Sequence, residues 1–241
     1  MSTAALAPDT PAQRGFLRVT EIFHSIQGES TWAGLPCVFV RLTGCPLRCV
    51  WCDTEYAFHG GTRMTFDEIR AQVARFGTRL VEVTGGEPLA HPGAFELVHS
   101  LLQDGYTVLV ETSGAVDVAP LDSRAHKIMD LKCPGSGESA KNLWSNLDHL
   151  TERDEIKFVV ADLDDLTWAE RTVRQHGLDR AVREGRLGGL LVSPVWDRVR
   201  PDGEGSPFLE SLAERVLASG LPLRLQLQLH KSIWGAATQG V

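Results

Sequence analysis

The sequence predicts a single α/β domain built as a partial, open parallel β/α barrel. Apolar, β-branched runs alternate with helical patterns along nearly the whole chain, which is typical of βαβ units around a parallel sheet. Fewer than eight such units are present, so the barrel is expected to stay open. The 241 residues fit one domain, and no linker divides them.

Eight segments have the composition of strands. They cover residues 18–23, 37–42, 80–83, 107–111, 127–131, 156–160, 189–192 and 223–229. Helices are expected over residues 65–75, 92–104, 162–176 and 207–219. Thr65 and Glu68 have the spacing of a capping box, which marks the start of the first helix. Gly105 and Gly177 follow the second and third helices as C-terminal caps.

Composition narrows the class of function. Apolar residues make up 43% of the chain and charged residues 23%, as in ordinary globular proteins. The formal net charge of -7 argues against nucleic-acid binding, which depends on clustered positive charge. No apolar run approaches the roughly 20 residues that span a bilayer, so no membrane association is expected. A small-molecule partner is favoured.

Residues 1–14 are rich in Ala, Pro, Thr and Ser and lack the basic and apolar regions of a signal peptide. We expect them to form a flexible tail before a domain that covers residues 15–241. Three of the five cysteines lie in one short loop, which suits metal binding in a reducing compartment better than a disulfide framework. A cytoplasmic location is therefore expected.

The residues that could take part in binding or catalysis follow predicted strands. The cysteine loop, Thr84 to Pro88, Thr112 to Gly114, Lys132 to Pro134, Ser193 and His230 with Lys231 all come just after such segments. Because ligands of parallel α/β sheets bind at the carboxyl ends of the strands, these groups should meet at one mouth. Neither of the glycine-rich phosphate-binding motifs G-x-G-x-x-G and G-x-x-x-x-G-K-[ST] occurs.

Cys45, Cys49 and Cys52 have the spacing C-x3-C-x2-C. Three thiolates can hold three irons of an iron–sulfur cube and leave the fourth iron open to a ligand. Structural zinc normally needs four ligands, and neither a second C-x2-C nor an H-x3-H pair is present, while Cys37 and Cys133 are isolated. An iron–sulfur cluster is therefore favoured, and a zinc-stabilised, non-catalytic binding module is the alternative.

The cysteine loop, with Trp51 before its last cysteine, and the later Thr84-Gly85-Gly86-Glu87-Pro88 segment resemble the radical S-adenosylmethionine (SAM) superfamily. The resemblance implies the open-barrel fold, a [4Fe-4S] cluster and SAM, whose methionine group binds the open iron. Reductive cleavage of SAM then gives a 5′-deoxyadenosyl radical. Activases that abstract hydrogen from a protein glycine share the cysteine motif, so an activase is a second alternative.

Within the superfamily, residues 25–30, 34–36, 39–42 and 44–54, together with 111–114, 130–132 and 228–231, resemble the 7-carboxy-7-deazaguanine synthase family. The resemblance covers nearly everything after the tail. It implies a carbon–nitrogen lyase of queuosine (7-deazapurine) biosynthesis that converts 6-carboxy-5,6,7,8-tetrahydropterin to 7-carboxy-7-deazaguanine with loss of ammonia. It also implies Mg2+, an external electron donor such as flavodoxin, and a homodimer. Ser30 departs from the family's usual glycine.

The resemblance implies roles for individual residues. Cys45, Cys49 and Cys52 match the cluster ligands. The positions that match SAM contacts are Trp51, Cys52, Asp53, Gly86, Glu87, Ser113, Lys132, Cys133, Pro134 and Ser193. Gly86 has no Cβ and lets the backbone approach a ligand, while Glu87 can accept hydrogen bonds from the methionine ammonium. Trp51 could instead serve only packing.

The positions that match substrate contacts are Ile26, Gln27, Gly28, Arg41, Thr84 and His230, and Thr54 matches the Mg2+ position. Gln27 offers donors and acceptors suited to an aminopterin edge, although a turn-forming loop also explains it. Arg41 lies in an apolar strand, where its planar fork suits the substrate carboxylate; a structural ion pair is the alternative. No protein acid or base is assigned, and His24 is interpreted as structural.

Overall fold

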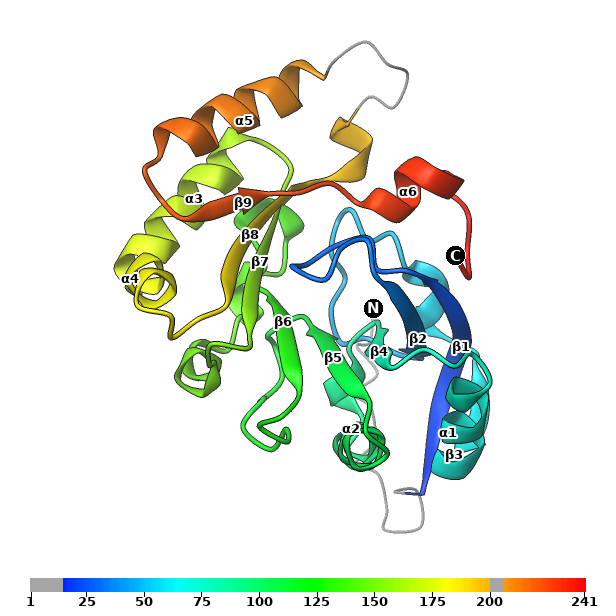
Figure 1. The fold of residues 1–241 in the computed structure, drawn as a ribbon. Coiled ribbons are helices and arrows are strands. Elements are labelled where there is room, and N and C mark those ends of the chain that lie inside the picture. Colours follow the sequence, from blue (N-terminus) through cyan, green and yellow to red (C-terminus); the bar gives the residue numbers. More distant parts are fainter. Residues whose placement is uncertain (1–14, 200–205) are drawn as a thin grey trace.

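The protein is described by a computed structural model that covers residues 15–199 and 206–241. The predicted tail, residues 1–14, lies outside this part of the chain. One curved sheet of nine strands forms the centre of the described structure, in the order β3-β1-β2-β4-β5-β6-β7-β8-β9. Figure 1 shows that the sheet bends into an open barrel with the helices on its outer side. The predicted open β/α barrel is confirmed.

The strands are β1 (Phe16–Ile26), β2 (Pro36–Leu42), β3 (Thr62–Thr65), β4 (Leu80–Gly85), β5 (Thr107–Thr112), β6 (His126–Asp130), β7 (Glu155–Val160), β8 (Gly189–Pro194) and β9 (Leu223–Leu225). All neighbours from β2 to β9 pair in parallel. β1 and β3 extend the β2 edge in antiparallel fashion. The sequence did not predict β3, because its four residues contain a single buried apolar side chain, Met64.

The helices are α1 (Phe66–Ala74), α2 (Gly93–Gln103), α3 (Leu163–Gln175), α4 (Leu178–Arg183), α5 (Pro207–Ala218) and α6 (Leu229–Trp234). The predicted capping box is confirmed: Thr65 Oγ1 accepts from the Glu68 N–H at 3.2 Å, and Glu68 accepts from the Thr65 N–H at 2.7 Å. α4 was not predicted. It follows Gly177, whose φ of 63° reverses the chain directly after α3.

The prediction of a strand over 223–229 is wrong in its second half. β9 ends at Leu225, and α6 begins at Leu229. The intervening glutamines bond to the loop after β1: Gln226 Oε1 accepts from the Ser30 N–H at 2.9 Å, and Gln228 donates to Glu29 at 2.8 Å. His230 and Lys231 consequently lie in a helical turn rather than at a strand end.

Side chains alternate between the two faces of the central strands. The outer face packs under the helices in two buried clusters, one beneath α1 and α2 and one beneath α3 to α5. On the inner face, Cys37, Phe39, Leu80, Leu109 and Ile128 form a small third cluster. Polar side chains lie further along the same face, and they surround the cavity described below.

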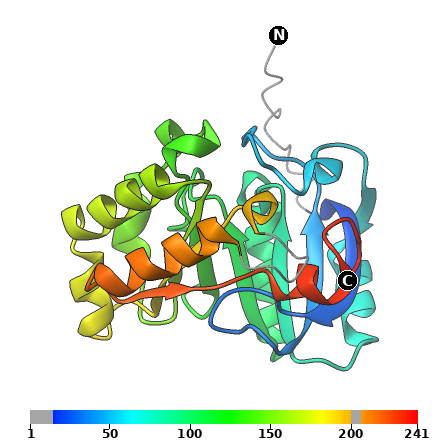
Figure 2. The same cartoon turned by 90° about the horizontal axis from the view of Figure 1, so that it is seen from above.

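The C-terminal segment runs back across the barrel. Figures 1 and 2 both place α6 and the C-terminus next to β1, and a Cβ on Gly240 would lie 3.6 Å from the Glu21 carboxylate of that strand. Within the described ranges, no helix combines the length and apolarity that a bilayer crossing requires.

Candidate functional site

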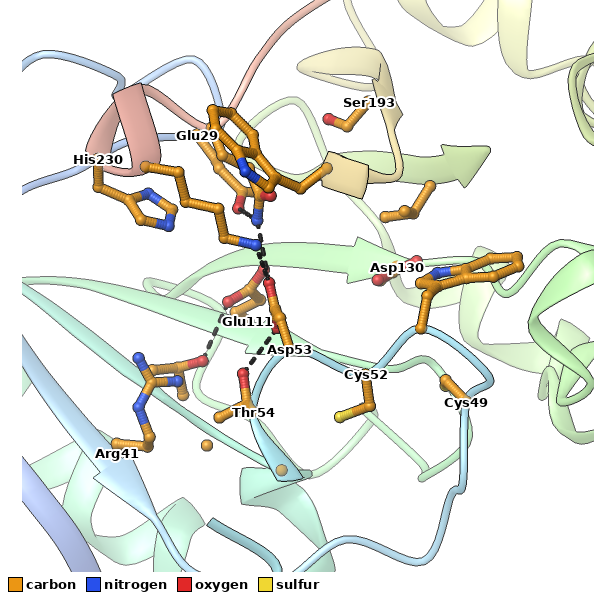
Figure 3. Close-up of a pocket in the computed structure, with 18 of the residues that line it drawn as sticks. Glu29, Arg41, Cys49, Cys52, Asp53, Thr54, Glu111, Asp130, Ser193 and His230 are labelled. Carbon is orange, nitrogen blue, oxygen red and sulfur yellow. Dashed lines mark hydrogen bonds and ion pairs between the residues drawn. The ribbon is translucent and has the colours of Figure 1, made fainter. Parts of the chain in front are cut away.

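A cavity of about 730 Å³ opens at the carboxyl ends of the parallel strands, within the size range of small-molecule sites. Strand ends, the cysteine loop and residues 236–241 line it. In Figure 3, Cys49, Cys52, Asp130 and Ser193 lie on one side, and Arg41 and His230 lie on the other. We call these the cluster side and the substrate side. The predicted convergence at one mouth is confirmed.

Cys45, Cys49 and Cys52 all reach the cavity as free thiols. Their loop is held in place by the backbone, because the Gly44 N–H donates to the Ala57 carbonyl at 2.7 Å and its carbonyl accepts from the Glu87 N–H at 2.9 Å. Burial raises the pKa of the Cys45 thiol to about 11 and also raises the pKa values of the other two. Three soft sulfur donors on one half-buried loop fit an iron–sulfur cluster.

Gly86 brings the β4 loop against the cysteine loop. A Cβ at this position would lie 2.5 Å from the Cys45 Cβ and 2.5 Å from the Gly44 carbonyl oxygen, so any larger residue would displace the cysteine. Trp51, on the other side of the loop, packs closely over Gly135: a Cβ there would lie 3.0 Å from the indole ring. Both contacts fix the position of the thiols.

Two buried oxygens on the cluster side have no hydrogen-bond partner among the described residues: Ser193 Oγ and Asp130 Oδ1. Both residues line the cavity, as do Ser113 and Lys132. Unpaired buried polar atoms are rare because they cost free energy, so this wall is suited to a polar ligand. Asp130, whose other oxygen accepts from Lys132 at 2.7 Å, was not predicted as a site residue.

Three predicted SAM contacts do not line the cavity, namely Glu87, Cys133 and Pro134. The Glu87 carboxylate is fully buried and accepts from the Ser113 N–H at 2.7 Å, from Thr112 Oγ1 at 3.0 Å and from the Leu89 N–H at 3.0 Å. As the N-cap of the short helix Pro88–Ala90, it turns toward β5. In this structure Glu87 supports Ser113 from behind the cavity, and its direct bond to a methionine ammonium stays a prediction.

Cys133 and Pro134 are likewise directed away from the cavity. Cys133 is buried in the cluster beneath α3 to α5, where desolvation raises the pKa of its thiol. Pro134 is exposed at the start of a short helix, Pro134–Ser136. Lys132 alone of the three predicted neighbours therefore reaches the cavity.

On the substrate side, Arg41 forms an ion pair and also lines the cavity. Its Nε donates to Glu21 at 2.8 Å, and Tyr56 donates to the same carboxylate oxygen at 2.9 Å, which is the predicted structural ion pair. The two terminal nitrogens make no hydrogen bond to any described residue, and Arg41 lines the cavity. The planar end of its guanidinium is thus available to a bound anion.

The loop after β1 is tightly fixed. The Gln27 side chain donates to Glu82 and accepts from the Glu29 N–H at 2.9 Å. Gly28 packs so closely against α6 that a Cβ would lie 2.2 Å from His230 Nδ1. It does not line the cavity, whereas Ile26, Gln27 and His230 do. Burial lowers the pKa of His230, which favours the neutral imidazole.

Ser30 lies in the middle of this loop with φ of 64°, and it is the one residue other than glycine with positive φ in the described chain. This conformation explains why glycine is the usual residue at the position. Ser30 Oγ accepts from the Trp32 N–H at 3.1 Å, which partly offsets the strain.

A buried ionic network, which the sequence analysis missed, lies on the substrate side of the cavity. Lys157 Nζ bonds to Glu29 at 2.8 Å and to Glu111 at 2.5 Å. Thr84 Oγ1 donates to Glu111 at 3.0 Å. Although burial opposes ionisation, the Lys157 ammonium lowers the pKa of Glu111 to about 2. Charged residues at alternate positions of apolar strands, the signal that identified Arg41, would also have identified Glu82, Glu111 and Lys157.

Asp53 and Thr54 lie between the two sides. Thr54 Oγ1 donates to Asp53 at 2.8 Å, and Lys231 Nζ bonds to the other carboxylate oxygen at 2.5 Å. Burial acts to raise the pKa of Asp53, but the Lys231 ammonium and these hydrogen bonds lower it below its usual value. In the ranges 15–199 and 206–241, no three His, Cys, Asp or Glu side chains converge on one ion position.

Comparison with known proteins agrees with this geometry. The profile of the Radical SAM superfamily matches residues 39–134. The 7-carboxy-7-deazaguanine synthase of Koribacter versatilis is 45% identical over 231 residues, covering 93% of this chain and 100% of the relative. That of Chlorobaculum tepidum is 43% identical and covers 93% and 97%. The crystal structure of QueE from Escherichia coli shares the fold, with a TM-score of 0.70 at 22% identity over 88% of this chain and 94% of that chain.

Proposed function

This chain belongs to the 7-carboxy-7-deazaguanine synthase family, and we propose that it converts 6-carboxy-5,6,7,8-tetrahydropterin to 7-carboxy-7-deazaguanine with loss of ammonia. The observation that carries the proposal is the identity of 45% along the full length of a named relative. The cavity supports it, because thiol donors lie on one side and an anion-binding Arg41 on the other. Neither a protein-glycine activase nor a zinc module has comparable support.

The enzyme is a radical SAM lyase that uses a [4Fe-4S] cluster and SAM. When bound, these cofactors supply a 5′-deoxyadenosyl radical that can abstract hydrogen from carbon. Cys45, Cys49 and Cys52 would hold three irons, since they are the cysteines that reach the cavity. Trp51, Cys52, Asp53, Gly86, Ser113, Lys132 and Ser193 would form the SAM wall. The unpaired Ser193 and Asp130 oxygens supply acceptors there.

Arg41 would orient the substrate. Its free terminal nitrogens can take a carboxylate in bidentate fashion, while Glu21 holds the side chain in place. The neutral imidazole of His230 adds a hydrogen-bond donor, and Ile26, Gln27 and Thr84 complete the proposed substrate pocket, with Gly28 packed behind His230. Residues 236–241 line the same cavity and would limit access of water.

Thr54 would provide a protein oxygen for Mg2+. Its hydroxyl lies beside the Asp53 carboxylate at the cavity wall. Because Mg2+ keeps several waters and prefers oxygen ligands, one hydroxyl together with the substrate carboxylate is sufficient without a protein cage. Loss of turnover on chelation, restored by added Mg2+, would support this assignment.

Three further proposals follow from family membership. An external one-electron donor such as flavodoxin would reduce the cluster, the enzyme would act as a homodimer, and residues 15–241 would form its single radical SAM domain. The free thiols at the cavity suit the reducing conditions of the cytoplasm.

The decisive experiment is anaerobic. Protein reconstituted with iron and sulfide and then reduced should convert the carboxypterin, in the presence of SAM and Mg2+, to a deazapurine identified by mass spectrometry. SAM binding without turnover would favour an activase or another substrate. A colourless, diamagnetic protein after reconstitution would instead support the zinc module.

A further inference from the structure

Glu82 is a buried acid in the cavity that the proposed function does not yet use. It points inward from β4, where it pairs with Phe39 of β2 on one side and Leu109 of β5 on the other. It is 2% exposed and lines the cavity. Arg41 and Thr84 form the next inward pair toward the mouth, so Glu82 lies one layer deeper than the proposed carboxylate site.

The charges of the cavity leave Glu82 without a cation. Lys157 bonds to Glu29 and Glu111, and Arg41 bonds to Glu21. Within the described chain, Glu82 makes one side-chain hydrogen bond, to the Gln27 amide, and no ion pair. Desolvation, reinforced by the nearby Glu111 charge, raises the pKa of Glu82 well above its usual value. A ligand with N–H donors would satisfy this carboxyl group.

The proposed substrate has such donors at the required end. In a 6-carboxypterin, the carboxylate and the 2-amino-4-oxo edge lie at opposite ends of the bicyclic ring. The edge presents two parallel N–H groups, at the ring N3 and the 2-amino nitrogen, as a guanidinium presents two to a carboxylate. With the carboxylate at Arg41, the edge points inward. Two residues along a strand span about 6.6 Å, which is comparable with the length of the ring system.

Gln27 supports the same assignment. Its amide nitrogen is directed to Glu82 and its oxygen to the Glu29 N–H, so the group expected to recognise the edge is already bonded within the protein. We propose that Glu82 is a specificity-determining residue that binds the aminopyrimidinone edge and selects pterins over ring systems without the 2-amino group. This inference rests on the proposed function.

The test compares two fluorescent ligands, pterin-6-carboxylate and lumazine-6-carboxylate, which has oxygen in place of the 2-amino group. Fluorescence titration of the SAM-loaded holoenzyme should show that the wild type prefers the pterin. Glu82→Gln should weaken pterin binding by about 10- to 100-fold, the loss expected for a charged bidentate contact. Lumazine keeps the N3–H but has no 2-amino donor, so its binding should weaken less, and most of the preference for the pterin should be lost. SAM affinity should stay unchanged.

Exposed Glu96 on α2 provides the control, because Glu96→Gln makes the same chemical change away from the cavity. Glu82→Asp keeps the carboxylate and should retain a preference for the pterin, which tests the inference if Glu82→Gln does not fold. Equal loss of both ligands, or no loss of either, would overturn the inference. If the wild type does not turn over the carboxypterin at all, the proposed function fails. If the wild type does turn it over, but Glu82→Gln and Glu82→Asp both keep the full preference for the pterin over the lumazine, only the inference fails.

Discussion

The two sides of the cavity are built in different ways. The cluster side takes its three thiols from one loop of eight residues, 45–52, whose shape is fixed by local turns and by Gly86. The substrate side takes its side chains from β2, β4, β5, β7, α6 and the loop after β1, and its central ion pair joins Glu29 to Lys157, 128 residues apart. The cluster ligands are thus encoded locally, whereas substrate recognition depends on buried charges that only the folded chain brings together.

The largest effect should come from the cluster side. Cys49→Ser removes one of three thiolates, so the reconstituted protein should lose most of its cluster iron and its activity should fall by more than about 1000-fold. Iron content and visible absorbance measure the loss. Cys37→Ala, which removes a cysteine outside the cavity, should keep both. Normal cluster assembly in Cys49→Ser would show that the loop is not the ligand set.

The second largest effect should be a loss of protein stability when the ionic network of the substrate side is broken. Lys157→Met leaves Glu29 and Glu111 buried without their cation, which should lower the free energy of unfolding by about 3–5 kcal/mol. Because the folded pKa of Glu111 lies at about 2, its stabilisation is present above its ordinary pKa and lost as the pH falls toward 2. Urea titrations at several pH values should show that dependence in the wild type and a weaker one in the variant.

Arg41→Lys should affect substrate binding and not SAM binding, and it therefore distinguishes the two sides of the cavity. Lysine cannot make the planar bidentate contact, so binding of the carboxypterin should weaken by about 1.5–3 kcal/mol, while SAM affinity should be unchanged. Calorimetric titration of each ligand measures the difference. Equal losses for both ligands would mean that Arg41 serves only its ion pair with Glu21.

Glu82→Gln should stabilise the ligand-free protein at neutral pH. Because the folded pKa is raised, the unfolded state loses its proton first, and Glu82 destabilises the fold increasingly as the pH rises above its ordinary pKa. The gain in melting temperature should therefore be larger at pH 8 than at pH 5. If the gain in melting temperature is the same at both pH values, Glu82 is not a buried acid that lacks a cation.

Ser30 should give the smallest effect. Ser30→Gly removes left-handed strain of about 1 kcal/mol but also the bond to the Trp32 N–H, so its net effect should be near zero. Ser30→Ala keeps the strain and loses the bond, and it should destabilise by about 1 kcal/mol. Chemical denaturation of the two variants compares them directly. A stabilised alanine variant would show that the hydroxyl is not used.

Sequence reasoning succeeded where the determining contacts are local. The Thr65 capping box needs only residues three apart, and the inward position of Arg41 follows from strand alternation. It did not predict the bonds of Glu87, whose carboxylate accepts from Thr112 at the end of β5 and from Ser113 directly after it. It also failed for residues 226–229, where composition suggested a strand but glutamine bonds to the loop after β1 draw the chain away from the sheet.

The linear order of residues was sufficient for the open barrel, the thiol loop and the family, because periodicity and short motifs act through neighbours in the chain. Folding in three dimensions was needed to show that one lysine neutralises two of the three central glutamates and leaves Glu82 without a cation. The reason is physical: the state of a buried charge depends on which distant strands supply its partners and exclude water from it.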